Sequence, residues 1–64
     1  MATFEELRAT FLRCEARYYE LKAVLADIRG EEYFAKGYRD EAHRLDTEAQ
    51  ELLVAEAQAA VRSL

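Results

Sequence analysis

The chain contains one histidine, His43, and carboxylates lie three residues away on either side of it. On a helix, Asp40, His43 and Asp46 share one face. Carboxylate–histidine pairs at this spacing hold metals in helical bundles when facing helices add glutamates, and Glu20 is the candidate for that role. Asp40 can instead pair with Arg44, and His43 falls outside the apolar arc of its helix. We therefore assign no metal ligands and no cofactor, and we keep a metal-binding bundle around Asp40 and His43 as an alternative.

Residues for covalent chemistry are few. Cys14 is the single cysteine, and no Cys/His cluster has zinc spacing. Cys14 lies on an apolar stripe, so we expect a small core residue and not a reactive thiol. The sequence has no nucleophile–base pairing, glycine-rich phosphate loop or nucleotide fingerprint. We therefore predict no catalytic residues and no enzymatic activity.

Four tyrosines and three phenylalanines could form a platform for a ligand or for nucleic-acid bases. Helical spacing explains most of them as core residues with tyrosine hydroxyls at the rim. Tyr19 differs, because alanines surround it on a separate stripe. We interpret Tyr19, together with Leu12, as an anchor for a partner helix.

The net charge is −4, and the acidic residues gather in the second half. No basic residue occurs between Arg44 and Arg62, a stretch with four carboxylates that are candidates for contact with a basic partner: Asp46, Glu48, Glu51 and Glu56. This balance argues against nucleic acid as a partner. An acidic inhibitor that mimics nucleic acid remains an alternative function. We interpret Arg13 and Arg17 as residues that form salt bridges with Glu20 or with a neighbouring helix.

Two apolar stripes with helical spacing run along the first half of the chain, and their centres lie roughly 150° apart around one helix. The bulky stripe keeps an unbroken 3-4-3-4 spacing over Phe4, Leu7, Phe11, Cys14, Tyr18, Leu21, Leu25 and Ile28. The small stripe has the same spacing over Ala9, Leu12, Ala16, Tyr19, Ala23 and Ala26. A helix that is apolar on two nearly opposite sides needs two partners.

Thr3 and Glu6 match a capping box, and Arg29-Gly30 is typical of a helix C-terminus. We predict a single domain over residues 1–64, with a helix over about 3–29, a turn region over about 30–37 and a helix over about 38–63. A start of the second helix near 31 is the alternative. The second helix carries an apolar arc that contains Glu56. This residue either pairs with Arg8 or faces water where the C-terminal turn splays away from the first helix. The arc comprises Phe34, Ala35, Tyr38, Ala42, Leu45, Ala49, Leu52, Leu53, Ala57, Ala60 and Leu64.

The predicted fold class is all-α: an antiparallel two-helix hairpin that dimerises into a four-helix bundle. We expect the bulky stripe to pack against the second helix of the same chain. The small stripe, from Ala9 to Ala26, is then the expected interface with a second copy or a partner protein.

The expected function is a small, non-catalytic protein–protein interaction module: an adaptor, co-chaperone or regulator. The acidic N-terminus is unlike a secretory signal, and no apolar run approaches the roughly 18–20 residues of a membrane span. We therefore expect a cytoplasmic protein with no membrane partner.

Overall fold

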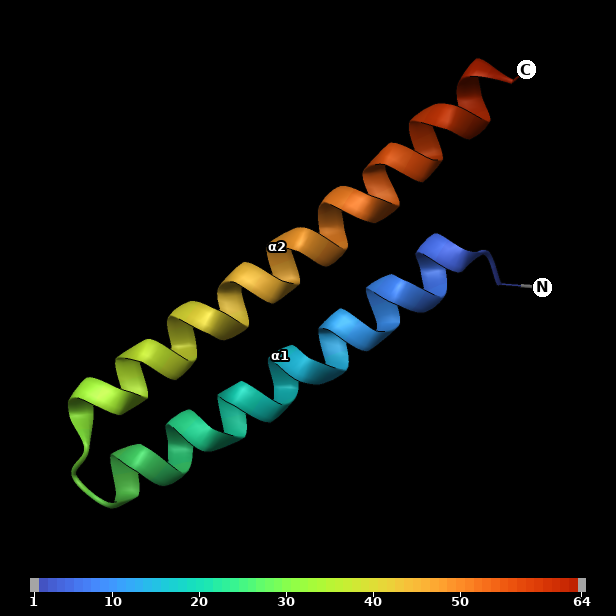
Figure 1. The fold of residues 1–64 in the computed structure, drawn as a ribbon. Coiled ribbons are helices and arrows are strands. Elements are labelled where there is room, and N and C mark those ends of the chain that lie inside the picture. The colour runs from blue at the N-terminus through green and yellow to red at the C-terminus, as the bar shows by residue number, and fades with distance from the viewer. Residues whose placement is uncertain (1, 64) are drawn as a thin grey trace.

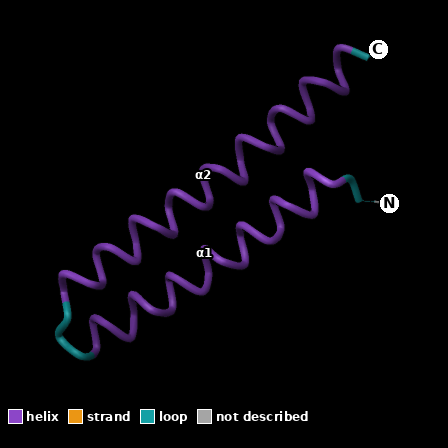
Figure 2. Tube along the Cα trace, in the orientation of Figure 1, coloured by secondary structure: helices purple, strands orange, loops and turns teal. Residues whose placement is uncertain are grey.

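The computed structural model describes residues 2–63, which form two antiparallel helices joined by a short turn (Figure 1). Helix α1 spans Phe4–Ile28 and helix α2 spans Glu32–Arg62. Outside the helices, the described residues form only the turn and the short chain ends (Figure 2). The Cα trace measures 53 × 19 × 10 Å, so the hairpin is a single layer of two helices. The predicted all-α hairpin is confirmed.

The capping box predicted at the start of α1 is present. The Thr3 hydroxyl accepts a hydrogen bond from the Glu6 backbone N–H at 3.1 Å, and the Glu6 carboxylate accepts one from the Thr3 N–H at 3.4 Å. These bonds satisfy two of the N–H groups that a helix start leaves unpaired.

The predicted end of α1 at Arg29-Gly30 is confirmed by a Schellman motif. Gly30 has φ of 76°, its N–H bonds to the Asp27 carbonyl at 3.0 Å, and the Glu31 N–H bonds to the Ala26 carbonyl at 2.8 Å. Only glycine adopts this left-handed conformation without strain. Because α2 begins at Glu32, the start at about 38 is wrong, and the earlier start near 31 is the one observed. Helix α2 continues through Gly37.

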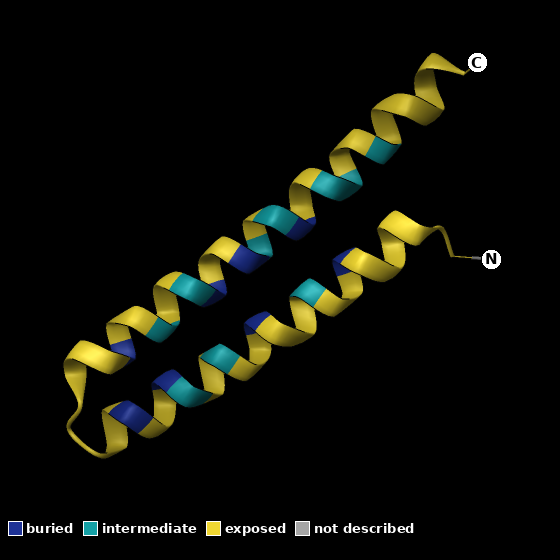
Figure 3. Cartoon of the chain, in the orientation of Figure 1, coloured by how far each residue is buried: buried dark blue, intermediate teal, exposed yellow. Residues whose placement is uncertain are grey.

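The buried residues form one narrow seam between the helices (Figure 3). Seven of the eight are alanines, and Leu45 is the eighth: Ala9, Ala16, Ala23 and Ala26 on α1 with Ala35, Ala42, Leu45 and Ala49 on α2. Both helices carry alanine at a seven-residue spacing, which lets the two backbones approach closely over many turns. Each alanine buries about one methyl group, worth roughly 0.8 kcal/mol, so this core is thin.

The predicted roles of the two stripes are therefore wrong, and the structure reverses them. The small stripe of α1 faces α2, whereas the bulky stripe, from Phe4 to Ile28, lies exposed. The reason is complementarity: α2 offers a row of alanines, which fits a row of small residues more closely than it fits phenylalanine and tyrosine. Phe34 is also exposed, while Leu64, the last residue of the predicted arc, lies outside the described residues.

Three ion pairs join the helices along the edges of the seam. Arg17 contacts Asp46 at 3.0 Å, Arg39 contacts Asp27, and Arg8 lies 3.8 Å from Glu48. Of the two alternatives for Glu56, the pairing with Arg8 is not observed: Arg8 lies near Glu48, and Glu56 is half-buried further along α2. The last turns of α2 extend past the start of α1 (Figure 1). These pairs are compatible with the register in which the alanine rows meet, and each contributes little to stability because its side chains are partly exposed.

Candidate interaction surface

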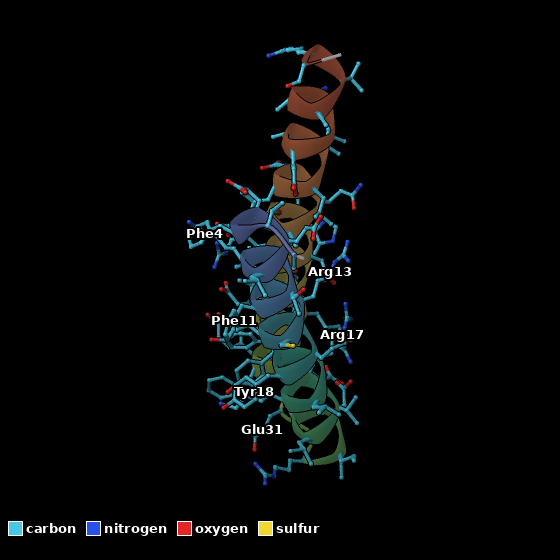
Figure 4. The ribbon with its side chains drawn as sticks, turned by 90° about the vertical axis from the view of Figure 1, so that its right-hand side faces the viewer. Phe4, Phe11, Arg13, Arg17, Tyr18 and Glu31 are labelled. Carbon is cyan, nitrogen blue, oxygen red and sulfur yellow. The ribbon has the colours of Figure 1, made fainter. Side chains whose placement is uncertain are left out.

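The largest apolar surface of the hairpin is the side of α1 that faces away from α2. We define the outer stripe of α1 as Phe4, Leu7, Phe11, Cys14, Tyr18, Leu21, Leu25 and Ile28. All eight are exposed, and Phe4, Phe11 and Ile28 each leave more than 70% of their area accessible. Figure 4 shows Phe4, Phe11 and Tyr18 on one side of α1, with Arg13 and Arg17 on the other.

The spacing of this stripe is that of a coiled-coil seam. Phe4, Phe11, Tyr18 and Leu25 repeat every seven residues, and a second row interleaves with them: Leu7, Cys14, Leu21 and Ile28. These are the a and d positions of four consecutive heptads. A stripe with a strict seven-residue repeat drifts slowly around a straight α-helix. Two helices keep such stripes in contact by winding around each other in a left-handed supercoil. The outer stripe therefore has the heptad spacing of a coiled-coil seam along its whole length.

One edge of the outer stripe merges with an aromatic cluster. The Tyr18 and Tyr19 rings meet edge to face with centroids 5.4 Å apart, and the Tyr19 and Tyr38 rings stack at 6.1 Å. The Lys22 ammonium lies 5.1 Å from the Tyr18 centroid and 5.2 Å from that of Tyr38. A side-chain hydrogen bond with Tyr18 and the nearby tyrosine hydroxyls raise the pKa of Lys22 above its ordinary value. The cluster braces α1 against α2 and holds Tyr18 at the rim of the stripe.

The residues predicted as the interface are placed inside the hairpin. Ala9, Ala16, Ala23 and Ala26 are buried against α2 and are not available to another chain. Leu12 and Tyr19, the expected anchors, are half-buried and pack against the cluster of Ala16, Ala42 and Leu45. This correction follows directly from the reversed stripes.

Two of the four acidic candidates are engaged by arginines of the same chain. Asp46 accepts from Arg17, while Glu48 lies 3.8 Å from Arg8 and 3.5 Å from Arg44. Arg17 also bonds Glu20, and this bond, with the charge of Asp46, raises the pKa of Arg17. The predicted pairing of Arg17 with Glu20 and with a neighbouring helix is confirmed. Glu51 is exposed and Glu56 is half-buried.

The residues of the alternative metal site do come near one another. Glu20, His43 and Asp46 line one shallow hollow, together with Arg39. Arg17 occupies the carboxylates of both Glu20 and Asp46. Asp40 does not pair with Arg44 as expected: it accepts from Lys36 at 2.9 Å, and Arg44 bonds Glu41. Within residues 2–63, no group of three or more His, Cys, Asp or Glu side chains is placed to hold a metal ion.

A signal in the sequence could have assigned the stripes correctly. Alanines recur every seven residues in both halves, at 9, 16 and 23 and again at 35, 42 and 49. Two alanine rows with equal spacing fit each other, which leaves the bulky heptads for another helix. Neither described helix has an apolar stretch long enough to cross a membrane.

Comparisons of this chain with protein-family models, with curated proteins and with solved structures find no match.

Proposed function

We propose that this protein is a non-catalytic helical interaction module that docks one further helix along the outer stripe of α1 and thereby self-associates or binds another protein. The observation that carries the proposal is the exposure of four complete apolar heptads on the face opposite α2. Single exposed apolar residues are ordinary on protein surfaces, but a contiguous patch of this length marks an interaction site.

The energetics of the hairpin support the same proposal. Its core consists of alanines and one leucine, and a chain of this size keeps little stability from such a core alone. The outer stripe carries larger side chains than the alanine seam, so covering it would bury substantial further apolar area. Docking of a helix would then contribute to folding as well as to binding, because anything that binds only the folded chain stabilises it.

Cys14 supplies the test, because it lies in the middle of the outer stripe and is exposed in the hairpin. The rate of alkylation of Cys14 by a thiol reagent is measured in freshly opened cells that make the protein. The matched control is the double variant Cys14→Ser/Thr47→Cys, whose only thiol lies at an exposed position of α2.

We expect Cys14 to react at least about tenfold more slowly than the control thiol, since a docked helix covers it. Equal rates, after both are normalised to the denatured protein, would show that the outer stripe stands open and would refute the proposal.

A further inference from the structure

We propose that the helix docked on the outer stripe is α1 of a second copy of this chain, running antiparallel with the two stripes overlapping over their full length. This inference rests on the proposed function, because it names the occupant of the same surface. The arrangement places the four helices in the order α2, α1, α1 and α2, with the two outer stripes facing each other at the centre.

The exposed apolar area of the outer stripe matches the area that each chain buries in a stable dimer. Each of the seven large side chains on the outer stripe leaves half or more of its area accessible. Together they present on the order of 800 Å² per chain, which is the share that one partner contributes to an interface of standard size. The largest apolar patch of a typical monomer is only about 300–600 Å². A dimer in which the two outer stripes face each other removes this excess apolar area of both chains from water.

The heptad spacing of the outer stripe also favours α1 of a second copy as the docked helix. Knobs-into-holes packing needs a facing helix with apolar residues at the same heptad spacing and over the same length. Of the two described helices, α1 alone has such a row free. The outward side of α2 carries Asp40 and Thr47 at seven-residue spacing before Val54 and Val61, so its apolar row is half as long.

The sizes of the side chains favour the antiparallel orientation. Full overlap in this orientation sets Phe4 opposite Ile28 of the second copy, Phe11 opposite Leu21, and Cys14 opposite Tyr18. These three layers each combine a larger and a smaller side chain, and the fourth sets Leu7 opposite Leu25, so the helix separation stays even. A parallel dimer in register would instead stack Phe11 on Phe11 and Tyr18 on Tyr18, with a narrow layer of two cysteines between them.

The charges beside the stripe are compatible with close approach. Arg8 and Arg17 flank the stripe, and both are engaged within the chain, by Glu48 and by Asp46. Arg8 and Arg17 therefore meet the second copy with counter-charges from their own chain, and Lys22, at the edge of the stripe, lies over the Tyr18 and Tyr38 rings. The overhanging end of α2 lies outside the overlap and does not obstruct it.

The first test is the mass of the purified protein by sedimentation equilibrium across the micromolar range. We expect a dimer, and we expect Phe11→Glu to raise its dissociation constant on the order of a thousandfold, because the variant buries unpaired charges in the interface. Val54→Glu, which changes an exposed apolar residue of α2 to the same acid, should leave the dimer intact. A helical, monomeric wild-type chain at high micromolar concentration would overturn the proposal.

The second test addresses orientation by complementation. Phe11→Glu and Leu21→Lys should each fail to dimerise alone, and their equimolar mixture should form a heterodimer. In the antiparallel register the new acid of one chain faces the new base of the other, while the remaining Phe11 and Leu21 keep their native layer. In a parallel dimer these positions never meet. A wild-type dimer whose two variants do not complement each other would overturn the antiparallel register.

These outcomes separate the two proposals. If purified wild type is monomeric with a reactive Cys14, but Cys14 is protected in opened cells, the interaction module stands and the second copy is refuted as its occupant. If Cys14 reacts freely in both settings, the proposed function itself fails.

Discussion

Arg17 of α1 reaches across the hairpin to Asp46 of α2, with its Nη2 atom 3.0 Å from Oδ1 and 3.1 Å from Oδ2. The two residues are separated by 29 positions in the sequence, and their contact lies at the edge of the alanine seam. With the helices in this arrangement, the small stripe of α1 faces inward and the bulky stripe faces outward.

A double-mutant cycle tests this cross-helix pair. Arg17→Ala and Asp46→Ala should each lower the thermal midpoint slightly, and the double variant should lose less than the sum of the two. The coupling should shrink at high salt, because both side chains are partly exposed and their attraction is screened. Strictly additive losses at low salt would show that the pair is absent in solution.

The alanine seam predicts intolerance of larger side chains. Ala16 has no accessible area, so Ala16→Leu should destabilise the chain by about 1–3 kcal/mol through overpacking. Ala55→Leu, at an exposed position of α2, should change stability by less than about 0.5 kcal/mol. Urea denaturation measures both. If Ala16→Leu proves neutral or stabilising, the small stripe does not face α2.

The two glycines should respond to alanine in opposite directions. Gly30 has φ of 76°, so Gly30→Ala should destabilise by about 1–2 kcal/mol, since alanine is strained in this conformation. Gly37 lies inside α2 with open space around it, so Gly37→Ala should stabilise by about 1 kcal/mol. Thermal unfolding of both variants checks the prediction. Changes of the same sign would contradict the observed turn and the unbroken helix.

A pH effect is expected from one ion pair on α2. The hydrogen bond from Arg44 holds the pKa of Glu41 below its ordinary value, so ionised Glu41 is favoured by folding. The stabilisation is then present above the unfolded pKa of about 4.3 and is lost as pH falls through the lower folded pKa. Glu41→Gln should melt below wild type at neutral pH and match it in strong acid. In an Arg44→Gln background, Glu41→Gln should shift the melting temperature by a similar amount at neutral pH and in strong acid.

Local features of the fold could be predicted from the sequence because short-range chemistry decides them. The capping box at Thr3 and Glu6 and the glycine terminus at Gly30 need only neighbouring residues. The pairing of stripes could not be settled by periodicity, because both stripes of α1 have the same spacing. It depends on which side of α2 each stripe fits, and on long-range ion pairs such as that between Arg39 and Asp27.

The candidate surface was visible in the sequence, but its role was misassigned. Bulky apolar residues such as Phe11 usually lie in a core, and the hydrophobic effect alone favours that assignment. The close approach of two alanine rows, as at Ala16 and Ala42, competes with this burial of bulky residues. It leaves the larger residues on the outside of the hairpin. A second copy of α1 would restore the usual outcome, with the large side chains buried in an interface.

The antiparallel dimer is tested most directly by an isotope-filtered NMR experiment on an equimolar mixture of ¹³C-labelled and unlabelled protein. In the antiparallel dimer, nuclear Overhauser contacts between chains should join the Phe11 ring to the Leu21 methyls and Leu7 to Leu25. Contacts from the Ala16 methyl to α2 should arise within one chain only. Intermolecular contacts at Ala16, or none at Phe11, would contradict the antiparallel dimer.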